Sequence, residues 1–298
     1  MHLSDHDLTL LAQYAIDAAS KAGQFLETYS PTNLTVNWKT QASSLASAVV
    51  TEADLKSQEI IVDALRSSME TYDLALLSEE SPDDHSRFMK DYFWCIDPID
   101  GTLPFTEGKN GYAISIALVS KAGKPVIGVV HNPPTNKIWH AIIGQGAFEN
   151  EVAIDLGTIE DDGSSIQYFV DRSFLDDPRF EDTKAMLESN DPNLPPKSTS
   201  IDYVGGAVMQ AITAVNYSRG CYFKYPRVEN GGGSIWDYAA TNCIYQELQL
   251  FATDIHGDPM DLNRTASTFM NHRGIIYATN RDLLKTIRSV YMDIQEST

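Results

Sequence analysis

The stretch Asp97-Pro98-Ile99-Asp100-Gly101-Thr102 directly follows an apolar run, Tyr92–Ile96, that is typical of a buried strand. Such a strand would deliver two carboxylates to its C-terminal end. Pro98 disfavours a helical conformation at Asp97 and Gly101 permits a sharp turn, so the two carboxylates can converge instead of pointing to opposite faces. An ordinary Asp-Pro turn with a capping acid would contain the same residues, and these six positions alone leave that alternative open.

Two converging carboxylates suit a hard divalent cation. Mg²⁺ prefers oxygen ligands in near-octahedral geometry and keeps several of its waters, so two or three carboxylates per ion are enough. The turn would also begin a helix, and the first backbone N–H groups of that helix, on Gly101 and Thr102, would face a phosphate oxygen.

Three other segments place carboxylates at element ends. One segment is Ser78-Glu79-Glu80-Ser81-Pro82, which follows the apolar run Leu74–Leu77. A second is Ser234-Ile235-Trp236-Asp237, which opens a helix. The third is Thr51-Glu52-Ala53-Asp54, which resembles a capping box. Taken singly, Asp237 and Asp54 are the kind of residue that more often caps a helix. Beside the Asp97–Thr102 stretch, this context favours a functional role for these carboxylates over an ordinary turn or cap.

Apolar periodicity predicts helices and strands in two unlike halves. The first half has helices at 7–29 and after Thr51, and a hairpin turn at Lys121–Pro125. Its expected strands are Leu74–Leu77, Tyr92–Ile96, Tyr112–Val119, Val126–Val130 and Ile138–Ile143. The expected elements of the second half are Ile166–Val170, Glu181–Ser189, Gly206–Asn216, Tyr222–Tyr225, Ile235–Leu248 and Arg281–Gln295. With a polar linker near 150–164, this predicts an α+β domain at 1–155 and an α/β domain at 156–298.

Composition narrows the class of protein. The 298 residues are 43% hydrophobic, which predicts a compact core, and carry a net charge of -19, which would repel a nucleic-acid polymer or an anionic membrane. Cys95, Cys221 and Cys243 form no CxxC pair, which gives no zinc-site spacing and fits a reducing compartment. Without a basic leader or a long apolar stretch, we expect a cytoplasmic protein.

The segments VVTEAD, LLSEES, DPIDGT and SIWDYAA, in this order and spacing, resemble the inositol monophosphatase superfamily of magnesium-dependent, lithium-sensitive phosphatases. The resemblance extends from about Leu10 to Asn280. It implies a layered αβαβα sandwich of the inositol monophosphatase and fructose-1,6-bisphosphatase type, with the active site between the two halves. It also implies hydrolysis of a small phosphate ester by metal-activated water, with no covalent phosphoenzyme.

The same resemblance implies roles for individual residues. The metal ligands would be Glu79, Asp97, the Ile99 carbonyl, Asp100 and Asp237. One Mg²⁺ would bind Glu79, Asp97 and Ile99, a second Asp97, Asp100 and Asp237, and a loosely held third would contact Glu79 mainly through water. Asp54 and Thr102 resemble the pair that orients and activates the attacking water, whereas Glu80 is expected to face away or cap a turn.

Substrate contacts are expected mainly from the second half. Tyr225-Pro226-Arg227 and Gly123–Val130 resemble the branch that removes the 3′-phosphate from adenosine 3′,5′-bisphosphate, and Arg227 would hold the second phosphate unless it is simply an exposed arginine. Glu229 lies one position from the usual substrate-binding glutamate of inositol-type members, so an inositol substrate stays open. Gly101, Thr102 and Lys39 are expected near the phosphate.

The sequence lacks the motifs of calcium-binding EF-hand proteins and of common nucleotide-binding enzymes. No glutamate follows DPIDG at the twelfth position of an EF-hand loop, and no P-loop or GxGxxG motif follows a strand. A non-catalytic metal-binding member of the fold and a fructose-1,6-bisphosphatase remain alternatives. The expected partner is a small phosphate ester, with a homodimer left open.

Overall fold

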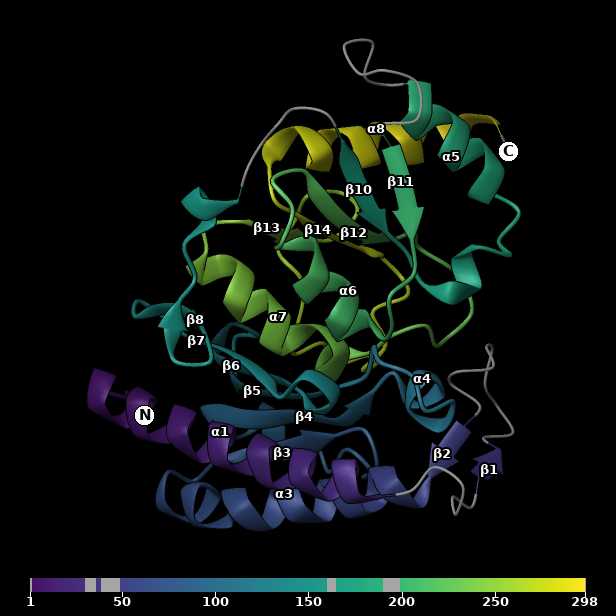
Figure 1. The fold of residues 1–298 in the computed structure, drawn as a ribbon. Coiled ribbons are helices and arrows are strands. Elements are labelled where there is room, and N and C mark those ends of the chain that lie inside the picture. Colours follow the sequence, from purple (N-terminus) through teal and green to yellow (C-terminus); the bar gives the residue numbers. More distant parts are fainter. Residues whose placement is uncertain (1, 30–35, 39–48, 160–164, 190–198, 298) are drawn as a thin grey trace.

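The computed structural model describes residues 2–29, 36–38, 49–159, 165–189 and 199–297. Its elements stack in five layers, which alternate between helices and sheets (Figure 1). The predicted αβαβα sandwich is therefore confirmed. Lys39 and residues 160–164 of the expected linker lie outside the described residues, and the boundary at 155 stays a prediction.

The first outer layer consists of α1 (Asp5–Thr28) and α3 (Glu52–Thr71), which pack against each other. Helix α1 begins with a capping box, in which the backbone N–H of Ser4 donates to Asp7 Oδ2 at 2.9 Å. Its buried residues recur every three to four positions, as the sequence predicts, and they face β5 and β6 of the first sheet.

The strands of the first sheet lie side by side in the order of the chain, as β3-β4-β5-β6-β7-β8-β9. β3 pairs with β4 in parallel and every other neighbouring pair is antiparallel. A separate short ribbon joins β1 (Val36–Trp38) and β2 (Val49–Thr51). The strands of the first sheet are β3 (Ala75–Ser78), β4 (Tyr92–Asp100), β5 (Ala113–Ser120), β6 (Pro125–Asn132), β7 (Lys137–Ile142), β8 (Gly146–Glu149) and β9 (Val152–Ala153).

Strand β4 is longer than predicted and carries an irregularity at its end. Asp97 pairs with Ser115 and Asp100 with Ala113, so the register of the β4–β5 ladder shifts between the two aspartates. In a regular strand, residues three apart point to opposite faces. A bulge-like shift re-aims side chains, and here it allows both carboxylates to face the same site.

The middle layer consists of α6 (Ala207–Ala214) and α7 (Ile235–Glu247), which lie between the two sheets (Figure 1). The run Tyr238–Tyr245 of α7 is buried at every position, because sheets cover the helix from both sides. One continuous core joins this layer to Phe93 and Val130 of the first sheet and to Tyr222 of the second.

The second sheet has the order β11-β10-β12-β14-β13, parallel from β11 to β12 and antiparallel from β12 to β13. Helices α5 (Phe180–Ser189) and α8 (Arg281–Ser297) cover its outer face (Figure 1). The strands are β10 (Ile166–Phe169), β11 (Thr199–Asp202), β12 (Gly220–Lys224), β13 (Phe251–Thr253) and β14 (Ile275–Ala278).

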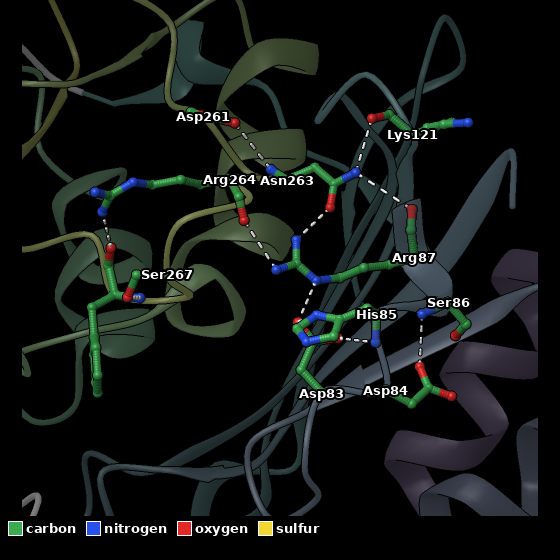
Figure 2. A network of polar contacts seen from close by, with 11 residues as sticks. Asp83, Asp84, His85, Ser86, Arg87, Lys121, Asp261, Asn263, Arg264 and Ser267 are labelled. Carbon is green, nitrogen blue, oxygen red and sulfur yellow. Dashed lines mark hydrogen bonds and ion pairs between the residues drawn. The ribbon is translucent and has the colours of Figure 1, made fainter. Parts of the chain in front are cut away.

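A buried arginine links segments that lie far apart in the sequence. Arg87 is 1% exposed, and its Nε pairs with Asp83 Oδ2 at 2.8 Å. Its Nη1 donates to Asn263 Oδ1 and its Nη2 to the Arg264 carbonyl at 3.0 Å (Figure 2). The Asn263 amide also donates to the Lys121 carbonyl at 2.9 Å. We call Asp83, Arg87, Asn263 and these two carbonyls the Arg87 network.

Candidate metal centre and active site

Three carboxylates meet where the first sheet faces the middle layer. Oxygens of Asp97, Asp100 and Asp237 lie within 4.8 Å of one another, the first two side chains being buried and the third partly buried. Asp97 and Asp100 come from the end of β4, whereas Asp237 lies in the first turn of α7. The structure therefore brings together two carboxylates of the first half and one of the second.

Backbone N–H groups hold each of the three carboxylates. Asp97 Oδ1 accepts from the Ile99 N–H at 3.0 Å, and Asp237 accepts from the Ser234 N–H in a capping box at the start of α7. Asp100 accepts from the N–H groups of Ala207 at 3.0 Å and Val208 at 2.8 Å, at the start of α6. These bonds fix the direction of each carboxylate before any ligand arrives.

Glycine is required beside Asp100. A Cβ atom at Gly206 would lie 2.2 Å from Asp100 Oδ2, so a side chain there would collide with the carboxylate. The Gly206 N–H also donates to the Gly111 carbonyl at 2.8 Å, which ties the start of α6 to the first half. Close approach of the two backbones therefore depends on this position being glycine.

Burial raises the pKa values of all three aspartates, and the charges of neighbouring carboxylates add to the shift. Burial, followed by the charge of Glu79, raises the pKa of Asp97 well above its usual value, and burial followed by Asp237 does the same for Asp100. Burial also raises the pKa of Asp237, against the opposing effects of the Ser234 N–H and Lys224. A divalent cation would relieve this repulsion, and the donors are the hard oxygens that Mg²⁺ prefers. The residues present thus fit a metal.

Thr102 and Asp54 lie side by side, as the sequence predicts. The Thr102 hydroxyl is 3.4 Å from Asp54 Oδ1 and 3.2 Å from the Ile99 carbonyl, and both can accept its proton. Asp54 is 1% exposed in the first turn of α3. Gly101, with φ of 86°, forms the turn that places Thr102 at the start of α4 (Thr102–Thr106).

Glu79 lies next to this cluster, although it is not one of the three carboxylates within 4.8 Å. It follows β3 directly, and its N–H donates to the Ile96 carbonyl at 3.2 Å, beside Asp97. Glu79 and Glu80 are both partly exposed. The Glu80 N–H donates to Gln58 Oε1 at 3.1 Å, on helix α3.

Two of the expected substrate contacts, Arg227 and Glu229, lie on the segment between β12 and α7. The Arg227 N–H donates to the Asn271 carbonyl at 2.9 Å, and Arg227 Nη1 is 3.0 Å from where a Cβ on Gly232 would stand. The Glu229 side chain is exposed, and its carbonyl accepts from the Asn271 amide at 2.8 Å. Glu229 is thus not part of the carboxylate cluster.

Asp171 and Lys224 belong to the electrostatic surroundings of the site, and neither was predicted from the sequence. They form an ion pair, Asp171 also accepts from the Tyr222 hydroxyl at 2.8 Å, and Lys224 donates to the Gly232 carbonyl. The charge of Lys224 lowers the pKa of Asp237 and that of Asp171 raises it. Asp171 follows a predicted apolar strand just as Asp97 does, and the same signal would have found it.

Comparison with known proteins agrees with this geometry. The model of the inositol monophosphatase family matches residues 7–294. The chain belongs to the inositol monophosphatase family. The family consists of metal-dependent phosphatases, and the Asp97, Asp100 and Asp237 cluster is an acidic site of the kind such enzymes need.

Individual members of the inositol monophosphatase family are related at modest identity. The chain is 29% identical to the 3′(2′),5′-bisphosphate nucleotidase CysQ of Escherichia coli K12 over 74% of its length and 82% of that protein. It is 28% identical to the fructose-1,6-bisphosphatase/inositol-1-monophosphatase of Thermotoga maritima, over 83% of this chain and 85% of that one.

A solved structure of the same fold is that of the extragenic suppressor protein suhB from Bartonella henselae. The TM-score is 0.70 at 24% identity, with 94% of this chain and 98% of that chain covered. At this identity the likeness concerns the fold alone. Within the described ranges, no helix has both the length and the apolar character needed to cross a membrane.

Proposed function

We propose that this protein is a Mg²⁺-dependent phosphomonoesterase that hydrolyses a small phosphate ester by direct attack of water. The observation that carries the proposal is the convergence of Asp97, Asp100 and Asp237 within 4.8 Å beside the Asp54–Thr102 pair. A site for metal binding alone has no need of a buried carboxylate aimed at a hydroxyl. The arrangement thus favours an enzyme over a regulatory member of the fold.

Glu79, Asp97, the Ile99 carbonyl, Asp100 and Asp237 would hold two or three Mg²⁺ ions. When bound, such ions neutralise the phosphate charge and lower the pKa of a coordinated water. Asp54 accepts a hydrogen bond from the Thr102 hydroxyl, which leaves the oxygen lone pairs of Thr102 directed at the attacking water. As the water attacks phosphorus, one of its protons passes to Thr102 while the Thr102 proton passes to Asp54, so that Asp54 acts as a base through Thr102. The ester oxygen leaves as the P–O bond breaks and takes up a proton from solvent.

Adenosine 3′,5′-bisphosphate is the substrate that we propose first. CysQ of E. coli, with 29% identity, is a 3′(2′),5′-bisphosphate nucleotidase, and Arg227 lies on the segment that leads to Asp237, where it would pair with the second phosphate. Inositol 1-phosphate is the second candidate, since inositol monophosphatase 2 of the mouse is 25% identical. With a net charge of -19, a small cytoplasmic ester suits the protein better than a nucleic acid.

A phosphate-release assay on three esters tests this proposal. The substrates are adenosine 3′,5′-bisphosphate, inositol 1-phosphate and fructose 1,6-bisphosphate, each with Mg²⁺, with excess EDTA and with added lithium. We expect the nucleotide to have the highest kcat/KM, EDTA to abolish release and lithium to inhibit it. Full activity in EDTA would contradict the metal requirement, and a higher kcat/KM for inositol 1-phosphate would contradict the choice of substrate.

A further inference from the structure

Helix α3 contacts both acidic turns of the site with residues of its first two turns. Asp54, Ser57 and Gln58 are three and four positions apart, a spacing that places side chains on one face of a helix. Asp54 lies against Thr102, and the buried Ser57 donates from its Oγ to the Pro98 carbonyl at 3.0 Å. Two of the three residues thus hold the turn that carries Asp97 and Asp100.

Gln58 holds the other turn, which carries Glu79. Its Nε2 donates to Ser81 Oγ at 2.8 Å, and its Oε1 accepts from the Glu80 N–H at 3.1 Å and from the Ser78 hydroxyl. A single side chain therefore bonds to the residues on both sides of Glu79. The Glu79 N–H adds the bond to the Ile96 carbonyl of β4, so the backbone at Glu79 is held from two elements.

The two turns are neighbours because β3 and β4 are parallel. Ser78 pairs with Ile96, so Glu79 and Asp97 leave the same edge of the sheet side by side. The pairing of β3 with β4 ends there, however: the chain turns away after Ser78, whereas β4 continues beside β5 to Asp100. Beyond the paired strands, α3 joins the two segments, through Gln58 on one and Ser57 on the other.

We propose that Gln58 is a positioning residue, which sets Glu79 at the distance from Asp97 at which both carboxylates can bind one metal ion. The inference rests on the proposed metal-dependent function. Metal ligands must be held within roughly 0.5 Å of their productive geometry, and loss of a residue that orients a ligand typically weakens binding by about 10- to 100-fold. Gln58 has no contact with substrate in this role and acts only through Glu79.

The test is Mn²⁺ binding, measured by the electron paramagnetic resonance of free Mn²⁺ and well below each variant's melting temperature. Gln58→Leu removes all three hydrogen bonds while keeping a side chain of similar size. We expect it to weaken the tightest Mn²⁺ site by about 10- to 100-fold. Gln13→Leu is the matched control, because it makes the same change on α1, where Gln13 donates to its neighbour Asp17 at 2.8 Å. The control should bind Mn²⁺ as the unaltered protein does.

A double variant separates positioning from general support of the fold. If Gln58 acts through Glu79, then Gln58→Leu should weaken Mn²⁺ binding little further in a Glu79→Gln background. Additive losses would contradict the inference, as would a Gln58→Leu protein that binds Mn²⁺ at full affinity. If Gln58→Leu does not fold, Ser81→Ala removes one of the three contacts and should show a smaller loss with the same dependence on Glu79. Absence of Mn²⁺ binding by the unaltered protein would instead contradict the proposed function itself.

Discussion

Asp97 is the carboxylate that the proposed arrangement assigns to both principal ions. It is buried, its Oδ1 accepts from the Ile99 N–H, and an asparagine could keep that bond. We therefore expect Asp97→Asn to fold and to lose at least about 100-fold in kcat/KM, since even residues outside the ligand set cost 10–100-fold. Glu80→Gln is the control and should cost little. Equal losses in the two variants, in a phosphate-release assay on folded protein, would mean that the ligands are wrongly assigned.

The same substitution changes stability in a way that depends on pH and metal. Burial and the charge of Glu79 raise the pKa of Asp97 in the folded state, whereas in the unfolded chain it returns to about 3.9. Between these two values the folded state binds more protons, so the free energy of unfolding falls as pH rises. The asparagine of Asp97→Asn does not titrate and escapes this loss.

In EDTA near neutral pH, we expect Asp97→Asn to melt at a higher temperature than the unaltered protein. The difference should shrink as the pH falls toward the unfolded-state pKa of about 3.9 and vanish below it, where the aspartate is protonated in both states. Excess Mg²⁺ should reverse the order, because only the unaltered site binds it tightly in the folded state. Melting curves at several pH values check this, and an unaltered protein that is the more stable in EDTA throughout would contradict it.

Substitution of Asp54, which contacts Thr102, distinguishes a catalytic role from a helix-capping role. If Asp54 were only a cap of α3, Asp54→Ala would lower the free energy of unfolding by about 0.5–2 kcal/mol and leave turnover intact. If the pair orients water, misplacement by about 1 Å reduces kcat about 100-fold, with little change in KM. We expect the second result. Thr102→Ala should lose kcat to a similar extent, and the double variant should lose little more kcat than either single variant. Near-normal turnover by Asp54→Ala kept cold would restore the capping role.

At the scale of elements, the Arg87 network ties the segment 83–87 to the segment 261–264 (Figure 2). Breaking a buried ion pair on one side typically costs about 3–5 kcal/mol, because it leaves charges and carbonyls unpaired. We expect Arg87→Met to lower the free energy of unfolding by about 3 kcal/mol in a urea titration. Arg66→Met is the control, since the Arg66–Asp63 pair is exposed and should show no measurable change. Equal effects would show that the Arg87 network stabilises the fold no more than an exposed ion pair does.

The long helices could be predicted from the sequence, whereas several of the short strands could not. Periodic apolar residues marked α1 and α7 to within a few positions, because each buries a long face or is covered on both sides. Strands β11 and β13 were missed, since Thr199–Asp202 and Phe251–Thr253 are short and nowhere fully buried. These strands form because they pair with strands that are remote in the sequence, and a local pattern of residues carries no information about such partners.

In the site too, some contacts could be predicted from the sequence, whereas contacts that depend on how distant segments pack could not. The Asp54–Thr102 contact and the convergence of Asp97, Asp100 and Asp237 were predicted, although through a family resemblance and not through spacing alone. The anchoring of Asp100 to the start of α6 was not predicted, because it depends on how the two halves pack. Nor were the contacts of Gln58, a polar helix residue with no distinctive motif around it.

At the scale of the whole molecule, the middle core joins both sheets. It includes Phe93 and Val130 of the first, Tyr222 of the second, and Tyr245 of α7 between them. We therefore expect one cooperative unfolding transition, with tryptophan fluorescence and phosphatase activity lost at the same urea concentration. Residues 1–155 produced alone should not fold stably, since the face that α7 covers would be open to water. Two separate transitions would show that the halves are independent domains.

The strand order of the first sheet also has a consequence for how the chain is made. From β4 to β9 each strand pairs with the next one in sequence, so these contacts are local and can form while the ribosome is still adding residues. The helices that cover the inner face, α6 and α7, are translated only afterwards. Until α6 and α7 have been synthesised, the nascent sheet exposes an apolar face to water. At a translation rate of about 5–20 residues per second, this interval lasts several seconds or more. Chaperone capture at the tunnel exit would protect this protein during synthesis.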